Sequence, residues 1–230
     1  MPGAESGDGG VALSGRVRVW DLPVRLFHWT VVGLVALSWL SVENGFLILH
    51  QWSGLTLLAL LLFRIAWGFA GSTTARFTDF VRGPGQALSY LRALSRGNRI
   101  LHPGHNPAGG WMVMALLMIL MLQATTGLYA NDGVHFSGPL AGQVSSDISD
   151  RLTSLHGSMF NVVIALVWIH VVAVLFYTYV RGENLIAPMI SGDKPGDQVP
   201  AGTELKFAAY SWALLWLALA AGAVWWMVRP

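Results

Sequence analysis

The sequence predicts an all-α integral membrane protein, a four-helix bundle with an additional fifth transmembrane helix and a cytoplasmic N-terminus. Hydrophobic residues make up 54% of the 230 residues and charged residues only 11%, whereas soluble domains carry about 25% charged residues. Five apolar stretches are each long enough to cross the hydrocarbon core of a bilayer, which is roughly 30 Å thick. The chain also contains 11 tryptophans, a residue that is enriched at membrane surfaces.

The five predicted spans are separated by segments of different length and composition. A tight turn at 43–45 joins the first two spans, and a long segment at 71–110 separates the second span from the third. An acidic loop at 130–154 precedes the fourth span, and a Gly- and Pro-rich linker at 181–206 precedes the fifth. The spans themselves are expected at Leu26–Val42, Leu47–Ala70, Trp111–Tyr129, Leu155–Tyr179 and Phe207–Val228.

Two local signals predict helices near the long segment between the second and third spans. Residues Pro84–Arg96 place three leucines beside arginines, which predicts either a short helix on the inner membrane surface or a solvated loop helix. Asn106 followed by Pro107 is typical of an N-cap residue and the first residue of a helix, so it predicts where the third membrane helix begins.

The basic residues are distributed unequally between the two ends of the predicted bundle. Because cytoplasmic loops of membrane proteins carry an excess of Lys and Arg, this bias predicts a cytoplasmic N-terminus and a C-terminus on the opposite side. The side assigned to the cytoplasm carries Arg16, Arg18, Arg25, Arg64, Arg76, Arg82, Arg92, Arg96, Arg99, Arg181, Lys194 and Lys206, and the other side carries Arg151 and Arg229 against Glu43, Asp132, Asp147 and Asp150.

Composition excludes several classes of site and partner. The chain has no cysteine, which excludes disulfides, thiolate-bound iron–sulfur clusters, c-type haem attachment and the common structural zinc motifs. Its net charge of +2 is too small to predict a nucleic-acid partner.

The chain is expected to divide into three parts. Residues 1–15 are Gly-rich and acidic and predict a disordered N-terminal tail; they lack the basic start and apolar core of a cleavable signal peptide. Residues 16–190 are expected to form the membrane bundle, and residues 191–230 a linker followed by the C-terminal transmembrane helix.

The spacing of two histidines in the fourth span is the strongest functional signal. His156 and His170 are fourteen residues apart, which on a helix returns to within about 40° of the same face, roughly 21 Å further along the axis. By depth, His50 is expected beside His156 at the outer side and His28 beside His170 at the inner side. Ionisable groups at membrane depth are usually functional, and two ligands for each of two irons predict two non-covalent b-type haems. A zinc or other transition-metal site is the main rival, although zinc prefers three or four clustered ligands.

Charged and polar residues near these histidines are candidates for further contacts. Arg25, Arg64 and Arg151 are candidates for pairing with haem propionates, or else for anchoring helices at the membrane surfaces. His105 is a candidate propionate contact or proton carrier, and His135 a candidate for an outer quinone or partner site. A position on a loop surface is the alternative for both histidines.

Small residues follow three of the four paired histidines. Gly33, Gly54 and Gly157 come shortly after His28, His50 and His156. Small side chains would let a flat macrocycle approach the helix backbones, but they also serve ordinary packing between membrane helices.

The chain resembles a known family in four places. The run VRVWDLPVRLFHW at 17–29 resembles the opening of bacterial di-haem cytochrome b561 proteins and of the cytochrome b subunits of nickel–iron hydrogenases. The runs LHQWSGLTLLALLLFRIAWGF, GHNPAGGWMVMALLM and LHGSMFNVVIALVWIHVVAV resemble the second, third and fourth helices of that family. The resemblance covers roughly residues 17–190, and its most specific parts are RLFHW and the LHG…IH pair.

The resemblance implies a four-helix bundle in the bacterial inner membrane that holds two b haems, with His28, His50, His156 and His170 as ligands. It also implies electron transfer between a membrane quinone and a periplasmic cytochrome c or a dehydrogenase or hydrogenase subunit. One branch of the family instead oxidises superoxide with ubiquinone as acceptor. A haem-free transporter or assembly subunit is the alternative from another class. The fifth span departs from the compact members and is expected to pack on a neighbouring subunit or on its own bundle.

The same residues indicate the kind of chemistry. If imidazoles fill both axial positions of each iron, electron transfer is favoured over oxygen chemistry. The quinone is expected at the inner side around His105, Asn106 and Arg25, with the outer loop as the alternative. Because that outer loop is acidic, it favours a basic protein partner over anionic superoxide.

Overall fold

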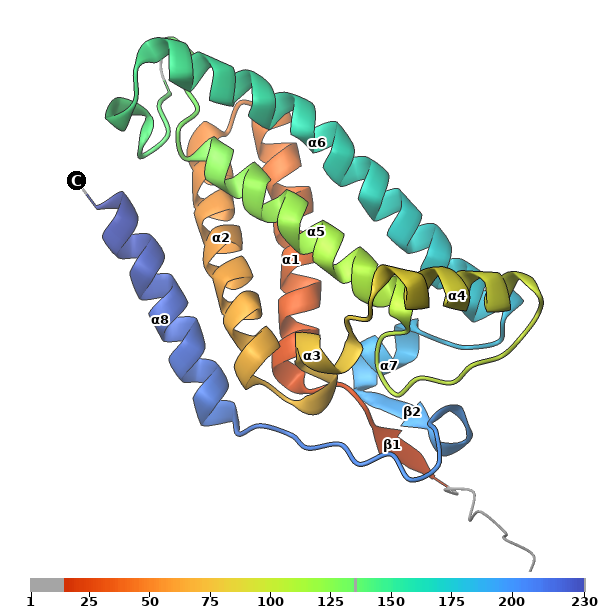
Figure 1. Cartoon of the computed structure of the whole chain (residues 1–230). Helices are drawn as coiled ribbons and strands as arrows, with labels where there is room; N and C mark the ends of the chain where they lie inside the picture. The colour runs from red at the N-terminus through yellow and green to blue at the C-terminus, as the bar shows by residue number, and fades with distance from the viewer. Residues whose placement is uncertain (1–14, 135, 230) are drawn as a thin grey trace, which may run out of the picture.

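The computed structural model describes residues 15–134 and 136–229, and within them the all-α membrane bundle is confirmed (Figure 1). The predicted N-terminal tail at 1–15 lies outside the described residues except for Gly15. The helices of these described ranges that are long and apolar enough to span a membrane are α1 (Leu22–Glu43), α2 (Leu47–Ala70), α5 (Pro107–Gly127), α6 (Ser146–Leu175) and α8 (Tyr210–Val228).

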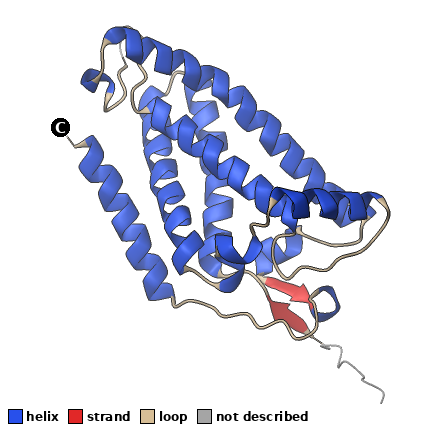
Figure 2. Cartoon of the chain, in the orientation of Figure 1, coloured by secondary structure: helices blue, strands red, loops and turns tan. Residues whose placement is uncertain are grey.

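Shorter elements gather mainly at the end of the bundle where α2 ends and α5 begins (Figure 2). Two strands, which the sequence did not predict, pair antiparallel with Val17 opposite Lys194. They join the start of the chain to the segment that follows α6. The shorter elements are β1 (Arg16–Arg18), η1 (Thr73–Ala75), α3 (Phe77–Phe80), α4 (Pro84–Ser95), η2 (Ala141–Gln143), the π-helical turn η3 (Phe176–Val180), α7 (Ile186–Ser191), β2 (Asp193–Pro195) and η4 (Gly196–Gln198).

Helix ends follow local capping chemistry rather than hydropathy alone. The side chain of Asn106 accepts a hydrogen bond from the Gly109 amide at 2.8 Å, so α5 begins at Pro107, as the capping signal predicts. The helix predicted at 84–96 is also present, as α4. The first span begins at Leu22 rather than at the predicted Leu26, because Asp21 caps the helix.

Two further predicted boundaries, the starts of the fourth and fifth spans, were also wrong. The fourth span begins at Ser146 rather than Leu155, because polar residues continue the helix beyond its apolar part and Asp147 lies in its first turn, where a helix favours negative charge. The predicted acidic loop is therefore shorter than 130–154. The fifth helix begins at Tyr210 rather than Phe207; the Ala208 amide donates to Ser72 Oγ at 3.1 Å, which holds the preceding residues outside the helix.

Helix α2 lies at the centre of the fold. Half of its most apolar stretch is buried, whereas 17% or less is buried in each of the other spanning helices of the described chain. Helices α1, α5 and α8 pack on it, and α6 packs on α5. The bundle therefore consists of two helical hairpins, α1–α2 and α5–α6, that meet mainly through α2 and α5.

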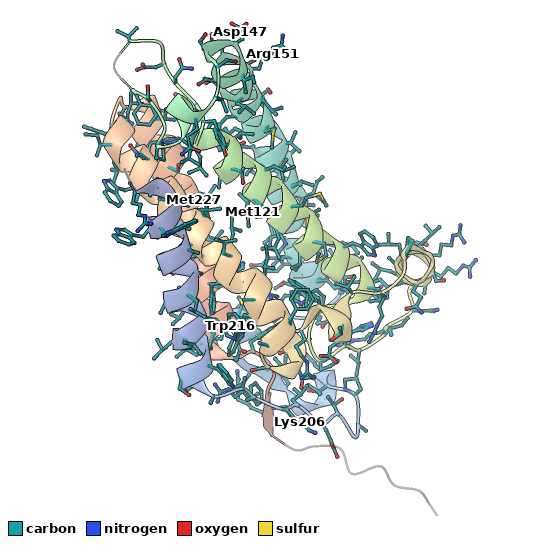
Figure 3. The ribbon with its side chains drawn as sticks, turned by 60° about the vertical axis from the view of Figure 1, so that its left-hand side comes forward. Met121, Asp147, Arg151, Lys206, Trp216 and Met227 are labelled. Carbon is teal, nitrogen blue, oxygen red and sulfur yellow. The ribbon has the colours of Figure 1, made fainter. Side chains whose placement is uncertain are left out.

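The fifth spanning helix packs on its own bundle, which was one of the two expected arrangements. Ala213 and Ala220 of α8 lie in a core cluster with Phe63 and Trp67 of α2. Trp216 and Met227 also pack against clusters formed with α2, as the side view illustrates (Figure 3). The opposite face of α8 exposes large apolar side chains, as expected of a helix surrounded by lipid.

The buried carboxylate of Asp21 connects the first two helices. It is only 2% exposed, and its Oδ1 accepts the Val24 amide at 2.8 Å, which caps α1. Its Oδ2 accepts the indole N–H of Trp67 at 2.9 Å, and Trp67 is fully buried at the end of α2. One side chain therefore fixes the start of α1 against α2.

Replacing Asp21 by Ala should lower the free energy of unfolding by about 2 kcal/mol, because the helix loses its cap and the buried indole loses its acceptor. The midpoint of thermal unfolding in detergent measures the loss. Asp21→Asn keeps an acceptor oxygen and should lose less, and Asp197→Ala, at an exposed position, serves as the control. Equal midpoints for Asp21→Ala and the control would contradict this role.

Candidate functional site

Four histidines from three helices form two facing pairs. The rings of His28 in α1 and His170 in α6 have their centroids 6.3 Å apart. The rings of His50 in α2 and His156 in α6 have their centroids 6.0 Å apart. Since both α6 histidines are on one continuous helix, the two pairs lie at different depths of the bundle, in the combination that the sequence predicts.

Hydrogen bonds donated to backbone carbonyls orient the rings of His50 and His156, the pair expected at the outer side. The Nδ1 of His50 lies 2.8 Å from the carbonyl oxygen of Ser38, and the Nδ1 of His156 lies 2.9 Å from that of Gln123. A carbonyl can only accept, so each Nδ1 carries the hydrogen and each Nε2 is an acceptor, which in His156 lies 3.4 Å from the side-chain amide nitrogen of Gln123. This arrangement is typical of metal-binding histidines, in which the second nitrogen fixes the tautomer and the ring orientation.

A cavity of about 380 Å³ lies between His50 and His156, within the range of sites that hold organic ligands. Its wall is mainly apolar. Gly54 and Gly157 are part of the lining, and a Cβ added at either would meet no neighbouring atom, so both glycines leave space on the cavity side. At Gly127 a Cβ would lie only 2.9 Å from Cε1 of His156, so the ring packs directly on the backbone of α5.

The His28–His170 pair, expected at the inner side, and the residues near it contain buried polar atoms that have no hydrogen-bond partner within the described ranges. These atoms include Nδ1 of His28, Nη1 of Arg64 and Nδ1 of His105. Arg64 is only 2% exposed, so anchoring at the membrane surface, one of its two expected roles, is wrong. A buried guanidinium is costly unless it has anionic or hydrogen-bonding partners. Its unpartnered nitrogen therefore fits an acidic group of a bound molecule.

His105 lies between two aromatic rings, with its centroid 4.7 Å from Trp20 and 4.6 Å from Phe80. Burial, followed by the positive charge of Arg64, lowers the pKa of His105 to about 3. The imidazole is therefore neutral at physiological pH. A contact with a propionate, as expected from the sequence, would then be a hydrogen bond rather than an ion pair.

The remaining candidates lie in different surroundings. Arg25 donates to the carbonyl of Ile190, and its Nε is a further buried atom without a partner in the described structure. Arg151 is exposed on α6 near Asp147, at the outer end (Figure 3). His135 lies outside the described residues.

Sequence reasoning missed the residues that orient the outer pair. Ser38 and His50 are each six residues from Asn44, so the tight turn between α1 and α2 could have predicted that they face each other. Gln123 and Thr126 also contact His156, with Thr126 Oγ1 lying 3.3 Å from Nδ1. The irregular loop between α5 and α6 hides that pairing in the sequence.

Comparison with known families identifies the bundle. The model of the family described as prokaryotic cytochrome b561 matches residues 19–192. The chain belongs to this family. The match confirms the resemblance expected from the sequence; it covers α1, α2, α5 and α6 and ends before α8. No curated protein and no solved structure shows a significant match to the chain. Members of the family are haem b cytochromes, so this chain is a multi-pass membrane cytochrome b that transfers electrons.

The paired histidines fit a haem of this cytochrome b561. Two imidazoles on opposite sides of one metal, with metal–nitrogen bonds of about 2.0 Å, place their ring centres about 6 Å apart. The two observed distances, 6.3 and 6.0 Å, match this separation. No group of three or more His, Cys, Asp or Glu able to hold a metal ion occurs in the described ranges. Two facing imidazoles at these distances suit an iron whose other ligands come from a macrocycle.

Gly127→Val should reduce the haem b content of the purified cytochrome b561, because the larger side chain displaces the His156 ring. Gly142→Val is the matched control, since a Cβ at Gly142 meets no atom within 4 Å. Haem per chain, from the pyridine haemochrome absorbance, measures the effect. Full haem content in the Gly127 variant would show that close packing on this ring is dispensable.

Proposed function

We propose that this cytochrome b561 carries two b haems and moves electrons across the bacterial inner membrane, between the quinone pool and a periplasmic partner. The observation that supports the proposal is that two pairs of facing imidazoles lie at two depths of one bundle. His28 and His170 would be the axial ligands of the inner haem, and His50 and His156 those of the outer haem. A pathway through both depths would connect the two membrane surfaces.

When bound, each haem would supply one-electron chemistry, and two histidines holding it would favour electron transfer over oxygen activation. The surrounding residues position and tune the ligands. The carbonyls of Ser38 and Gln123 hold the rings of His50 and His156 through Nδ1, and such bonds raise the basicity of the ligating nitrogen. Apolar side chains around the cavity keep water away from it.

In the proposed orientation, the end of the bundle that contains His28 and His170 faces the cytoplasm. The fold supports this orientation because β1, α4 and the segment after α6 bring arginines and lysines that are distant in sequence to the same end of the bundle. Excess positive charge is typical of the cytoplasmic side of a membrane protein. The outer pair would then lie near the periplasm.

A quinone site is proposed at the inner end, around His105, Asn106 and Arg25. A quinone head needs an aromatic or apolar slot and hydrogen-bond donors for its oxygens. Trp20 and Phe80 flank the His105 ring, and His105 and Arg25 each offer a buried nitrogen without a partner in the described structure. The two nitrogens would supply the donors, and the aromatic rings beside His105 give them apolar surroundings.

The outer end suits a basic periplasmic partner, such as a cytochrome c or a dehydrogenase or hydrogenase subunit. Glu43 and Asp132 are part of the outer cavity lining. Negative charge at this position attracts a basic protein and repels an anion such as superoxide. The acidic rim therefore favours the protein partner over the superoxide reaction.

Removing the histidines one at a time tests the ligand assignment. His28→Ala and His170→Ala should each remove the same b haem, and His50→Ala and His156→Ala should each remove the other. Each loss is measured as the disappearance of one set of α-band and low-spin electron paramagnetic resonance signals. His102→Ala, outside both pairs, should keep both haems. Loss of one common haem in His28→Ala and His156→Ala would show that the pairing is wrong.

Raising the ionic strength should slow electron transfer to a small basic cytochrome c. At 0.1 M salt the attraction between exposed charges is largely screened beyond about 10 Å. Glu43→Gln should lower the second-order rate constant at low salt and flatten its salt dependence. Stopped-flow oxidation of the quinol-reduced protein measures this constant, and Arg229→Gln is the control. A rate constant that rises with salt would contradict an acidic docking surface.

A further inference from the structure

Helix α4 is an amphipathic element that the electron-transfer site does not use. It lies at the end of the bundle where α2 ends and α5 begins, crosswise to α1 and α2 (Figure 1). Residues 80–106 contain four arginines and no Asp or Glu. Such a segment carries concentrated positive charge at the edge of the membrane-spanning region.

Hydrogen bonds before, within and after α4 hold the helix at this end of the bundle. The indole N–H of Trp111, in the first turn of α5, donates to the carbonyl of Arg82 at 2.9 Å. The hydroxyls of Tyr90 and Tyr177 are 2.8 Å apart and buried, which ties the middle of α4 to the end of α6. Arg181 donates to the carbonyl of Asn98 at 2.6 Å, just after the helix. Because tryptophans such as Trp111 favour the membrane–water boundary, these bonds place α4 at that boundary.

The inward direction of Tyr90 fixes which face of α4 is free. At about 100° per residue, the exposed side chains met on going round the helix from Tyr90 include Leu91, Ser95, Leu88, Arg92 and Arg96, in that order. Leu91 and Leu88 are 46% and 48% exposed, and both arginines are exposed as well. An apolar strip therefore lies directly beside a cationic strip, and no described element covers either.

We propose that α4 binds the surface of the membrane and recognises anionic phospholipid headgroups. Leu88 and Leu91 enter the boundary between headgroups and acyl chains, as the apolar face of an interfacial helix does. Arg92 and Arg96 then meet the lipid phosphates, for which a guanidinium offers forked hydrogen bonds. The charge pattern favours a lipid surface over a protein groove, since segment 80–106 has no acid to pair with its arginines.

Single cysteines test this proposal cleanly because the chain has none of its own. A spin label at Leu88→Cys or Leu91→Cys is compared with one at Ser89→Cys, which is exposed on the other side of the arginines. The full haem-loaded chain is placed in nanodiscs of phosphatidylcholine with increasing phosphatidylglycerol. Labels at 88 and 91 should become accessible to oxygen and protected from a water-soluble nickel complex, whereas the label at 89 should stay in water.

The arginines are tested on the same labelled chain. Arg92→Gln and Arg96→Gln should each raise the phosphatidylglycerol fraction needed for the half-maximal response about fivefold, since each cation contributes about that factor near an anionic surface. Arg229→Gln, which removes an exposed arginine directly after α8, is the matched control and should change nothing. An unchanged haem spectrum shows that each variant keeps its fold.

Two outcomes would overturn the proposal. Labels at 88 and 91 that stay in water at every lipid composition would mean that the leucine face is left for a soluble partner. Insertion that is the same with and without phosphatidylglycerol, and the same in the glutamine variants as in the chain with both arginines, would mean that apolar contact alone holds α4, without headgroup recognition. Insertion that depends on both phosphatidylglycerol and the arginines supports it.

Discussion

The distance between facing imidazoles determines how the bundle is built. His156 and His170 are on one uninterrupted helix, so α6 must keep two rings about 6 Å from partners on two different helices. A closely packed four-helix bundle would bring these rings into contact. The chain instead forms two tight hairpins, α1–α2 and α5–α6, that meet mainly through α2 and α5. This arrangement leaves room for a flat macrocycle between the hairpins.

The inner end of the bundle carries more buried polar groups than a simple helical hairpin requires. Lys194 is 2% exposed and pairs with Glu183 at 2.8 Å, and its Nζ also donates to the carbonyl of His102. A buried ion pair contributes little net stability, but losing one partner is costly. The Lys194–His102 bond ties the segment after α6 to the segment before α5, and the β1–β2 pairing ties it to the residues that precede α1. These contacts keep His28 and His170, near the ends of α1 and α6, in register.

Two helices lie beside the four helices that carry or support the paired histidines. Helix α8, beyond the matched region, covers one side of α2 and presents apolar side chains outward. Helix α4 lies at one end and is held by Tyr90 and by the bond from Arg181. Both use surface that the paired histidines leave free. The electron-transfer centre and the contacts with the membrane are thus separate parts of one chain.

The sequence alone determined the properties that depend on local spacing and composition. Apolar runs located all five spans, the Asn106–Pro107 pair located the start of α5, and a fourteen-residue interval placed two histidines on one face. These properties follow from helix periodicity and from the thickness of a bilayer, which act within one segment. The pairing of His28 with His170 could be predicted because membrane depth can be counted along each span.

Only the tertiary structure decided what depends on contacts between segments. The burial of Arg64, the carbonyls of Ser38 and Gln123 beside the histidines, and the packing of α8 on α2 are fixed by neighbours distant in sequence. The start of α6 at Ser146 was hidden because a polar helix outside the membrane has the same composition as a loop. Hydropathy reports the solvent around a segment, whereas hydrogen bonding and packing determine its conformation and its partners.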